Sequence, residues 1–147
     1  MIRNVDGNLR LSTYLYKKRD GKLFFGPLWD FDLAIGNVTP GDPNYHGAEL
    51  TDGWYIRLAP WFARMFQDPA FEAKVKERWA QLKRENRFES IMAYIDRRAI
   101  HLSEAQKPNY ERWRNLSTAP GSYEREVAKM KTWLQARIAW MDTQLGN

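Results

Sequence analysis

The last part of the chain carries the pattern that most restricts its fold. Between residues 122 and 146, apolar side chains recur at intervals of three and four residues over about five helical turns. They are Val127, Met130, Leu134, Ile138, Met141 and Leu145. This spacing predicts a helix with one apolar face, and such a face must pack against a core. Ser122 stands where an N-cap is expected, and Gly146 stands where the helix is expected to end.

Three further helices are expected between residues 68 and 116. Asp68 caps helices well and is followed by Pro69, which is favoured at the first helical position. The apolar residues of this helix would be Phe71, Val75, Trp79 and Leu82. A second helix is expected from about Glu89 to Gln106, and a short third one from Asn109 to Leu116. The inward residues of the second helix would be Ile91, Ile95, Ala99 and Leu102.

The first 60 residues favour strands and loops rather than helices. Ser12 to Lys17 and Lys22 to Phe25 are rich in residues that favour strands, and the Asp20-Gly21 pair between them predicts a hairpin turn. The segment 36–53 is full of Gly, Pro, Asn and Asp and is expected to be a long loop. We therefore predict an α+β, predominantly α fold with an N-terminal β-hairpin followed by about four helices. It is expected to form a single domain over residues 1–147, with the hairpin and an active-site-like loop in 1–60 and the helical part in 61–147.

Composition and charge exclude several classes of protein. The chain has no Cys and only two His, at positions 46 and 101, so disulfides, thiolate zinc sites and His-rich metal sites are excluded. It contains no apolar run of about 18 residues, so no membrane span is predicted. Residues 61–147 hold sixteen basic and eleven acidic side chains, which is the source of the net charge of +5. Without a block of basic residues, such an excess is typical of solvated helices, and nucleic-acid binding is not expected.

The run WDFD, from Trp29 to Asp32, is the densest group of candidate functional residues. Two carboxylates two residues apart on an extended chain point to the same side. Carboxylates that converge in this way suit Mg²⁺, which prefers hard oxygen ligands and often bridges to phosphates. Asn4 and Asp6 form a second polar cluster, which the hairpin would fold back towards the first. The alternative is that Asp30 and Asp32 cap turns at the exit of the hairpin.

Aromatic residues are expected in structural roles. Trp133, Arg137 and Trp140 share one face of the last predicted helix. An Arg between two indoles can stack on them, which is worth about 0.5–2 kcal/mol, and a buried Arg of this kind usually finds a carboxylate as well. Packing in the core or between helices is expected for Trp54, Trp61 and Trp79.

Several runs together resemble the spore coat protein H (CotH-like) family of atypical protein kinases. They are Tyr14 to Lys17 (YLYK), Asp20 to Leu23 (DGKL), Gly26 to Asn37 (GPLWDFDLAIGN), Asp68 to Phe71 (DPAF), Arg78-Trp79, Ile95-Asp96, Lys131 to Arg137 (KTWLQAR) and Trp140. Their order and spacing make the resemblance more specific than any single run. It covers nearly the whole chain, but only the C-terminal part of the usual length of the family.

This resemblance implies a kinase-like fold that binds ATP with a divalent metal and phosphorylates Ser or Thr of proteins. Mg²⁺ and ATP are accordingly the expected cofactors. Asp30 is similar to the metal-binding Asp that follows a short hairpin in protein kinases. Phe31 would take the place of the aromatic residue of that motif. Asp32 departs from the motif by replacing its Gly, and is expected to support Asp30 as a metal ligand.

The resemblance also implies a catalytic loop near the start of the chain. Asp6 is similar to the catalytic-loop Asp that positions the substrate hydroxyl. The Asn that normally binds a second metal five residues later is replaced here by Leu11. Asn8 or Ser12 would have to substitute for it in binding the cofactor, and the choice between them stays open.

Parts of a kinase that precede the catalytic loop are not found ahead of Asp6. The sequence has no Gly-rich phosphate loop and no strand Lys with a helical Glu partner. The chain is therefore expected to be the C-terminal lobe of a CotH-like kinase, inactive as an isolated fragment. Its expected partner is the missing N-terminal half of the same protein, and self-association through exposed apolar surface is a further expectation.

Three functions stay open on these grounds. The first is transfer of phosphate from ATP to Ser or Thr of a coat or surface protein. The second is a non-catalytic structural or binding module of a spore-coat or cell-surface assembly, which Leu11 and the absent phosphate loop favour for this chain alone. The third is a module that binds carbohydrate or nucleic acid through exposed Trp and Arg. The occurrence of the family implies an extracytoplasmic site, in a spore coat or at a bacterial cell surface.

Overall fold

A short antiparallel hairpin precedes the helices in the computed structural model, which describes residues 1, 3–5, 11–38, 41–45, 47–113 and 123–146. Strand β1 (Leu15–Lys17) pairs with β2 (Leu23–Phe25). The turn between them closes through a hydrogen bond of 3.0 Å from the Gly21 N–H to the Lys18 carbonyl. Asp20 takes the left-handed conformation there, with φ 59°. The predicted hairpin and its Asp-Gly turn are confirmed.

Helices make up most of the rest of the described chain. In order they are η1 (Asp32–Ile35), η2 (Ile56–Leu58), α1 (Pro60–Met65), α2 (Pro69–Arg84), α3 (Arg87–Leu102), α4 (Gln106–Arg112) and α5 (Tyr123–Leu145), where η marks a 3₁₀ helix. The fold is α+β and predominantly α, as predicted. Within the described ranges, no helix is long and apolar enough to cross a membrane.

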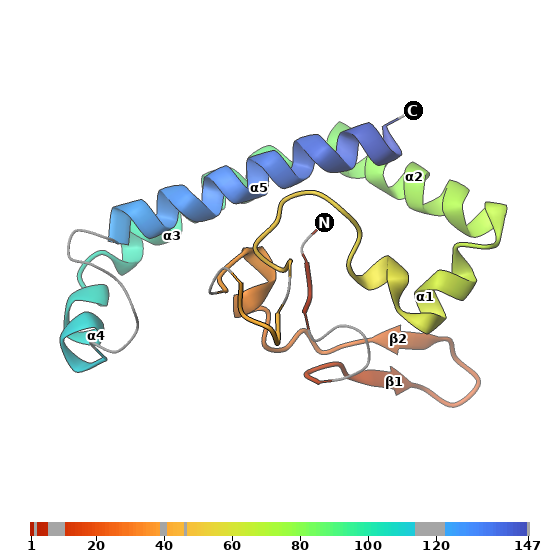
Figure 1. Ribbon diagram of the computed structural model, residues 1–147, viewed down its shortest axis with the longest axis horizontal. Helices are drawn as coiled ribbons and strands as arrows, with labels where there is room; N and C mark the ends of the chain where they lie inside the picture. The colour runs from red at the N-terminus through yellow and green to blue at the C-terminus, as the bar shows by residue number, and fades with distance from the viewer. Residues whose placement is uncertain (2, 6–10, 39–40, 46, 114–122, 147) are drawn as a thin grey trace.

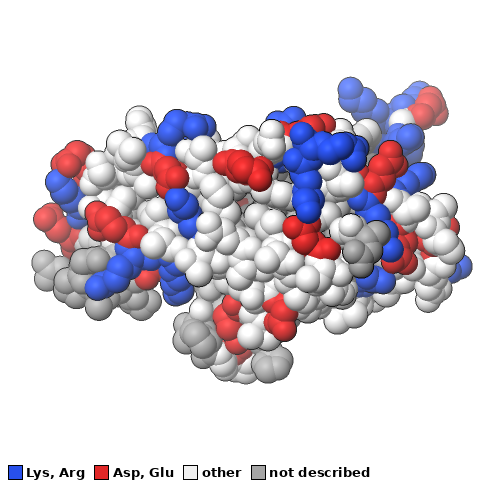
Figure 2. All heavy atoms as spheres, turned by 90° about the horizontal axis from the view of Figure 1, so that it is seen from above, with Lys and Arg blue, Asp and Glu red and all other residues white. Residues whose placement is uncertain are grey.

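The long helices lie side by side. Helix α5 packs on α2, α3 and η1, while the hairpin lies on the opposite side of the molecule from α5 (Figure 1). The loops between η1 and η2 lie between them. On the face seen in Figure 2, basic and acidic side chains are interspersed, so the positive charge is dispersed there rather than gathered in one patch.

The boundaries of α2 follow the predicted signals, and those of α3 and α4 do not. The Asp68 carboxylate accepts a hydrogen bond of 2.9 Å from the Ala70 N–H, which confirms the predicted cap of α2. Helix α3 ends at Leu102, ahead of the predicted Gln106, and α4 begins at Gln106. Pro108 is accommodated in the first turn of α4, where its missing N–H costs no helical hydrogen bond. Helix α1 lies in a segment for which no helix is predicted.

The apolar face predicted for α5 forms the core. Its buried residues Met141 and Leu145 cluster with Trp79 of α2 and Phe88 of α3. The rings of Trp79 and Phe88 lie 4.6 Å apart. The Trp79 indole N–H also donates a hydrogen bond of 2.8 Å to the Asp142 carboxylate, so the buried ring satisfies its one polar group.

Two expectations about packing are wrong. Leu102 is exposed because it is the last residue of α3. Trp61 of α1 is 53% exposed, so it does not pack in the core. Trp54 does pack as expected, with its ring 5.1 Å from that of Trp140.

Candidate functional site

The segment that follows β2 turns sharply and is not extended. Asp30 has the left-handed conformation, with φ 61°, and Asp32 begins the 3₁₀ helix η1. The premise that both carboxylates point to one side of an extended chain is therefore wrong. Asp enters the left-handed region at a lower cost than most residues, because its short side chain forms local hydrogen bonds. The turn explains why an Asp stands at position 30.

The hairpin brings Ser12 and Asp30 together across 18 positions of sequence. The Ser12 hydroxyl donates a hydrogen bond of 3.0 Å to Oδ2 of Asp30. Ser12 is itself left-handed, with φ 48°. A non-glycine residue in this conformation costs on the order of 1–3 kcal/mol, and such residues gather at functional sites. Two of the predicted site residues therefore meet in a strained and exposed corner of the molecule.

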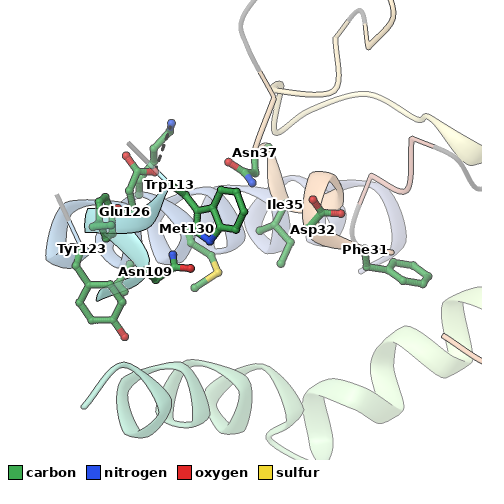
Figure 3. Close-up of a pocket in the computed structure, with 13 residues that line it drawn as sticks. Phe31, Asp32, Ile35, Asn37, Asn109, Trp113, Tyr123, Glu126 and Met130 are labelled. Atoms are coloured by element: carbon green, nitrogen blue, oxygen red, sulfur yellow. Dashed lines mark ion pairs between the residues drawn. The ribbon is translucent and has the colours of Figure 1, made fainter. Parts of the chain in front are cut away.

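Asp32 lies beside a cavity of about 540 Å³ between η1, α4 and α5 (Figure 3). We call this cavity the η1–α5 groove. Its lining includes Asp32, Ile35, Asn109, Trp113, Glu126 and Met130. Phe31, the residue that precedes η1, makes no side-chain capping bond to it. The Asp32 carboxylate is exposed, so it is accessible to a ligand.

The other predicted site residues lie near the start of the chain. Asp6 and Asn8 lie outside the described residues, so their predicted roles stay predictions. The adjoining segment 3–5 is placed, because the Arg3 N–H donates a hydrogen bond of 2.9 Å to the Ala34 carbonyl of η1. Asn4 lines a second cavity, of about 180 Å³, together with Ser12. The chain that leads to Asp6 therefore runs beside the helix that carries Asp32.

Two buried arginines, Arg3 and Arg137, hold the loop 47–53 in place, and we call them the arginine clamp. Arg137 is only 3% exposed and Arg3 only 6%. Arg137 donates hydrogen bonds to the carbonyls of Met1 at 2.9 Å, Thr51 at 3.0 Å and Gly53 at 2.7 Å. Arg3 donates to the carbonyls of Leu50 and Asp52. Backbone carbonyls thus take the place of the carboxylate that the sequence suggested as partner of Arg137.

Burial of the two positive charges of the arginine clamp costs free energy. Burial and, to a smaller extent, the neighbouring positive charge of Arg3 together lower the pKa of Arg137 to about 10, although Asp52 opposes the shift. Burial also lowers the pKa of Arg3. Arg137 stacks over the Trp140 ring at 4.6 Å, which confirms the predicted stacking for one of the two indoles. Both guanidinium groups stay charged at neutral pH, so their carbonyl partners offset a real desolvation cost.

Helix α5 also fixes η1 through Trp133. The indole N–H of Trp133 donates a hydrogen bond of 2.9 Å to the Glu49 carbonyl, one turn before Arg137. Gly36, which ends η1, is left-handed with φ 72° and lies so close to this indole that a Cβ would collide with it. Position 36 therefore requires Gly for two separate reasons. Through these contacts α5 positions both η1 and the loop 47–53.

Ser12 and Asp30, with Asp32 two residues further along the chain, carry oxygen donors of the kind that Mg²⁺ prefers. Asp30 and Asp32 offer exposed carboxylates, and Ser12 adds a hydroxyl. In sites of phosphoryl transfer, Mg²⁺ is commonly bound through one or two carboxylates, the phosphates and water. In the part of the chain that the structure describes, no three His, Cys, Asp or Glu side chains come together to hold a metal. The described carboxylates therefore do not form a closed metal site among themselves.

Sequence reasoning missed the residues of the η1–α5 groove. Asn109, Trp113 and Glu126 come from segments predicted only as helix, and no local pattern links them to η1. Ile35 and Asn37 do belong to the run GPLWDFDLAIGN, and that run was the available signal.

A family match extends over nearly the whole chain. The model of the family described as CotH kinase protein matches residues 1–141. The matched segment contains the hairpin, η1, the arginine clamp and most of α5. Neither a curated protein nor a solved structure matches the chain.

Proposed function

Since the chain belongs to the CotH kinase family, we propose that it supplies the metal-binding and acceptor side of a protein kinase that transfers phosphate from ATP to Ser or Thr. The observation that carries this proposal is the contact between Ser12 and Asp30 at the exit of the hairpin. Both residues are left-handed. The backbone is therefore strained where it presents this carboxylate. Such strain is typical of functional sites.

Each residue of the corner has a role in this proposal. Asp30 and Asp32 hold Mg²⁺, which neutralises charge on the phosphates of the nucleotide. Ser12 holds Oδ2 of Asp30 and so fixes the plane of the carboxylate. Asp6 is proposed to orient the acceptor hydroxyl, and Asn8 to assist in binding the cofactor.

The 147 residues contain no Gly-rich phosphate loop. In the proposal, the groups that hold the nucleotide phosphates come from outside them, and the isolated chain has little activity. Phosphoryl transfer depends on positioning and on electrostatic preorganisation, so part of a site catalyses poorly. An extracytoplasmic site, in a spore coat or at a cell surface, belongs to the same proposal and rests on family membership alone.

Binding of Mg²⁺–ATP to the Asp30→Asn variant tests the metal site. In the protein isolated from its host, the neutral amide should weaken Mg²⁺-dependent binding of ATP at least about ten-fold, measured by isothermal titration, and should abolish phosphoryl transfer. Asp20→Asn is the matched control, because Asp20 is also exposed and left-handed, with φ 59°, but lies in the hairpin turn. Full transfer with Asn at position 30 would contradict the site assignment.

A second candidate function is a non-catalytic binding module of a coat or surface assembly. The observation in its favour is the exposure of aromatic residues on the hairpin and after it, namely Tyr14, Tyr16, Phe24, Phe25 and Trp29. Exposed apolar surface of this kind marks protein interaction sites. This second function would be favoured if the protein binds no Mg²⁺–ATP and the Asp30→Asn variant still binds a partner.

A further inference from the structure

The η1–α5 groove shares only Asp32 with the proposed metal site and extends away from it. In Figure 3 its labelled residues follow one another from Phe31 and Asp32, past Ile35 and Trp113, to Glu126 and Tyr123. Its volume of about 540 Å³ lies in the range of sites that bind ligands. Because Asp32 lines the groove and is also a ligand in the proposed metal site, the proposed function places the two side by side.

The walls of the groove combine apolar surface with amide groups. Ile35 and Met130 are apolar, and the Trp113 indole is 50% exposed. The amides of Asn37 and Asn109 reach the groove from different elements (Figure 3). An Asn side chain can donate to and accept from a peptide backbone at the same time. Backbone recognition by polar groups, with a pocket for a side chain, is how extended peptides are bound.

The length of the groove sets how much of a peptide it accommodates. Tyr123 and Met130 of α5 both line it, and seven residues of helix span roughly 10 Å. An extended peptide rises about 3.3 Å per residue, so this length matches about three residues. At the far end, the Glu126 carboxylate lies 3.9 Å from the Lys129 ammonium group, so neither sign of charge is in excess there.

We propose that the η1–α5 groove binds the acceptor polypeptide and takes a large apolar side chain two to four residues from the Ser or Thr that is phosphorylated. This rests on the proposed function, because it places the acceptor hydroxyl at the Asp32 end. It also gives a role to Ile35 and Asn37, which lie in the family-like run but bind no metal in the proposal above.

Short peptides test the groove directly on the 147-residue chain. The probes are fluorescein-labelled nonapeptides of Gly and Ala with a central Ser and one Trp, placed in turn at each other position. Fluorescence anisotropy should show tightest binding with Trp two to four residues from Ser, at least about five-fold tighter than the peptide without Trp. Equal binding of all peptides would overturn the proposal.

Two variants decide whether the groove is the binding site. Trp113→Ala should raise the Kd of the best peptide about five-fold, and Asn37→Ala, at an exposed position, about three-fold. Trp61→Ala is the matched control, since Trp61 is 53% exposed but does not line the groove. Equal losses at Trp113 and Trp61 would overturn the proposal, as would saturable binding of chitohexaose in place of the peptides.

Transfer assays on the protein isolated from its host separate this inference from the proposed function. Trp113→Ala should raise KM for the peptide about five-fold, with kcat and KM for ATP unchanged, whereas Asp30→Asn should abolish transfer and leave peptide binding intact. Transfer with a KM that Trp113→Ala does not alter overturns the groove alone. Peptide binding at Trp113 without any Mg²⁺–ATP-dependent transfer overturns the acceptor role together with the proposed function.

Discussion

The hairpin with its following loops and the three long helices differ in what holds them together. Helices α2, α3 and α5 share an apolar core built around Trp79, Phe88 and Met141. In the hairpin, by contrast, each strand residue is exposed or only half-buried, and the stacked rings of Tyr16 and Phe24, 5.3 Å apart, lie at the surface. A two-stranded hairpin of this kind is marginally stable on its own.

In the site region the buried apolar residues are few and small, such as Val5, Ala34 and Ala48, and polar contacts connect the region to the long helices. The arginine clamp and Trp133 reach from the core helices to loop carbonyls. A region held by a few polar contacts opens more easily than a packed core. The site is therefore anchored by α5, while the apolar surface of the hairpin stays exposed.

A Leu→Ala substitution in each region should give the largest difference in the free energy of unfolding. Leu134→Ala removes a side chain that is 2% exposed and should lower the free energy of unfolding by about 3–4 kcal/mol, because it leaves a cavity in the core. Leu23→Ala, on the exposed β2, should cost less than about 1 kcal/mol. Urea unfolding measures both. Similar losses would show that the hairpin is packed as firmly as the helices.

Removal of the clamp comes next in size. Arg137→Met keeps most of the volume but leaves three carbonyls without their donor, which should lower the free energy of unfolding by about 3 kcal/mol. Arg84→Met on the exposed side of α2 is the control and should stay within about 0.5 kcal/mol of the parent. If both variants unfold at the same urea concentration, the clamp does not anchor the site.

Gly36 tests the contact between η1 and α5 in isolation. Gly36→Ala should lower stability by about 2–3 kcal/mol, because the new Cβ is both left-handed and in collision with Trp133. Gly41→Ala carries only the backbone cost, about 1 kcal/mol, since Gly41 has φ 80° and its Cβ would meet nothing within 4 Å among the described residues. The difference between their melting temperatures measures the Trp133 contact. No difference would mean that η1 moves freely on α5.

The smallest effect on the free energy of unfolding is expected in acid, and it concerns the core formed by the long helices. Burial raises the pKa of Asp142, but hydrogen bonds from Lys83 and Trp79 outweigh it, and the net pKa is below its ordinary value. Because the folded pKa is lowered, this carboxylate stabilises the fold above the unfolded pKa of about 3.9, and the gain is lost as pH falls through the folded pKa.

The partly exposed Asp142 pair limits that gain to about 1 kcal/mol. Urea unfolding between pH 2 and 6 should show a shallower loss of stability in Asp142→Asn than in the parent. Asp96→Asn is the control, since Asp96 is more exposed and pairs with Lys131 at the surface. If stability depends on pH in the same way in Asp142→Asn and in the parent, the charge of Asp142 does not contribute to the stability of the core.

Local signals explain which elements were predictable. The cap at Asp68, the Asp20-Gly21 turn and the apolar spacing on α5 depend on neighbours within a few residues, and the structure has all three. The conformations at Asp30 and Ser12 were not predictable, because no local pattern shows that these residues meet across 18 positions of sequence. The family resemblance named both residues as candidates for the site, but it did not predict the hydrogen bond between them.

Contacts between distant segments explain the rest. The helical face of Arg137 could be read from spacing, but the carbonyls opposite it lie on other segments and leave no mark on the local pattern. The η1–α5 groove is likewise assembled from three elements. Periodicity reports which face of a helix is buried, and it does not report what lies against that face.

The reach of Arg137 has a consequence for synthesis of the protein on the ribosome. Its carbonyl partners at Gly53, Thr51 and Met1 precede it by 84, 86 and 136 residues. The hairpin and the N-terminal helices are therefore translated long before the residue that ties the loops together, and contacts this distant in sequence form late. Helix η1, which begins at Asp32, is made early, but its contacts with α5 form only near the end of translation. A nascent chain therefore cannot complete these contacts before α5 has been made.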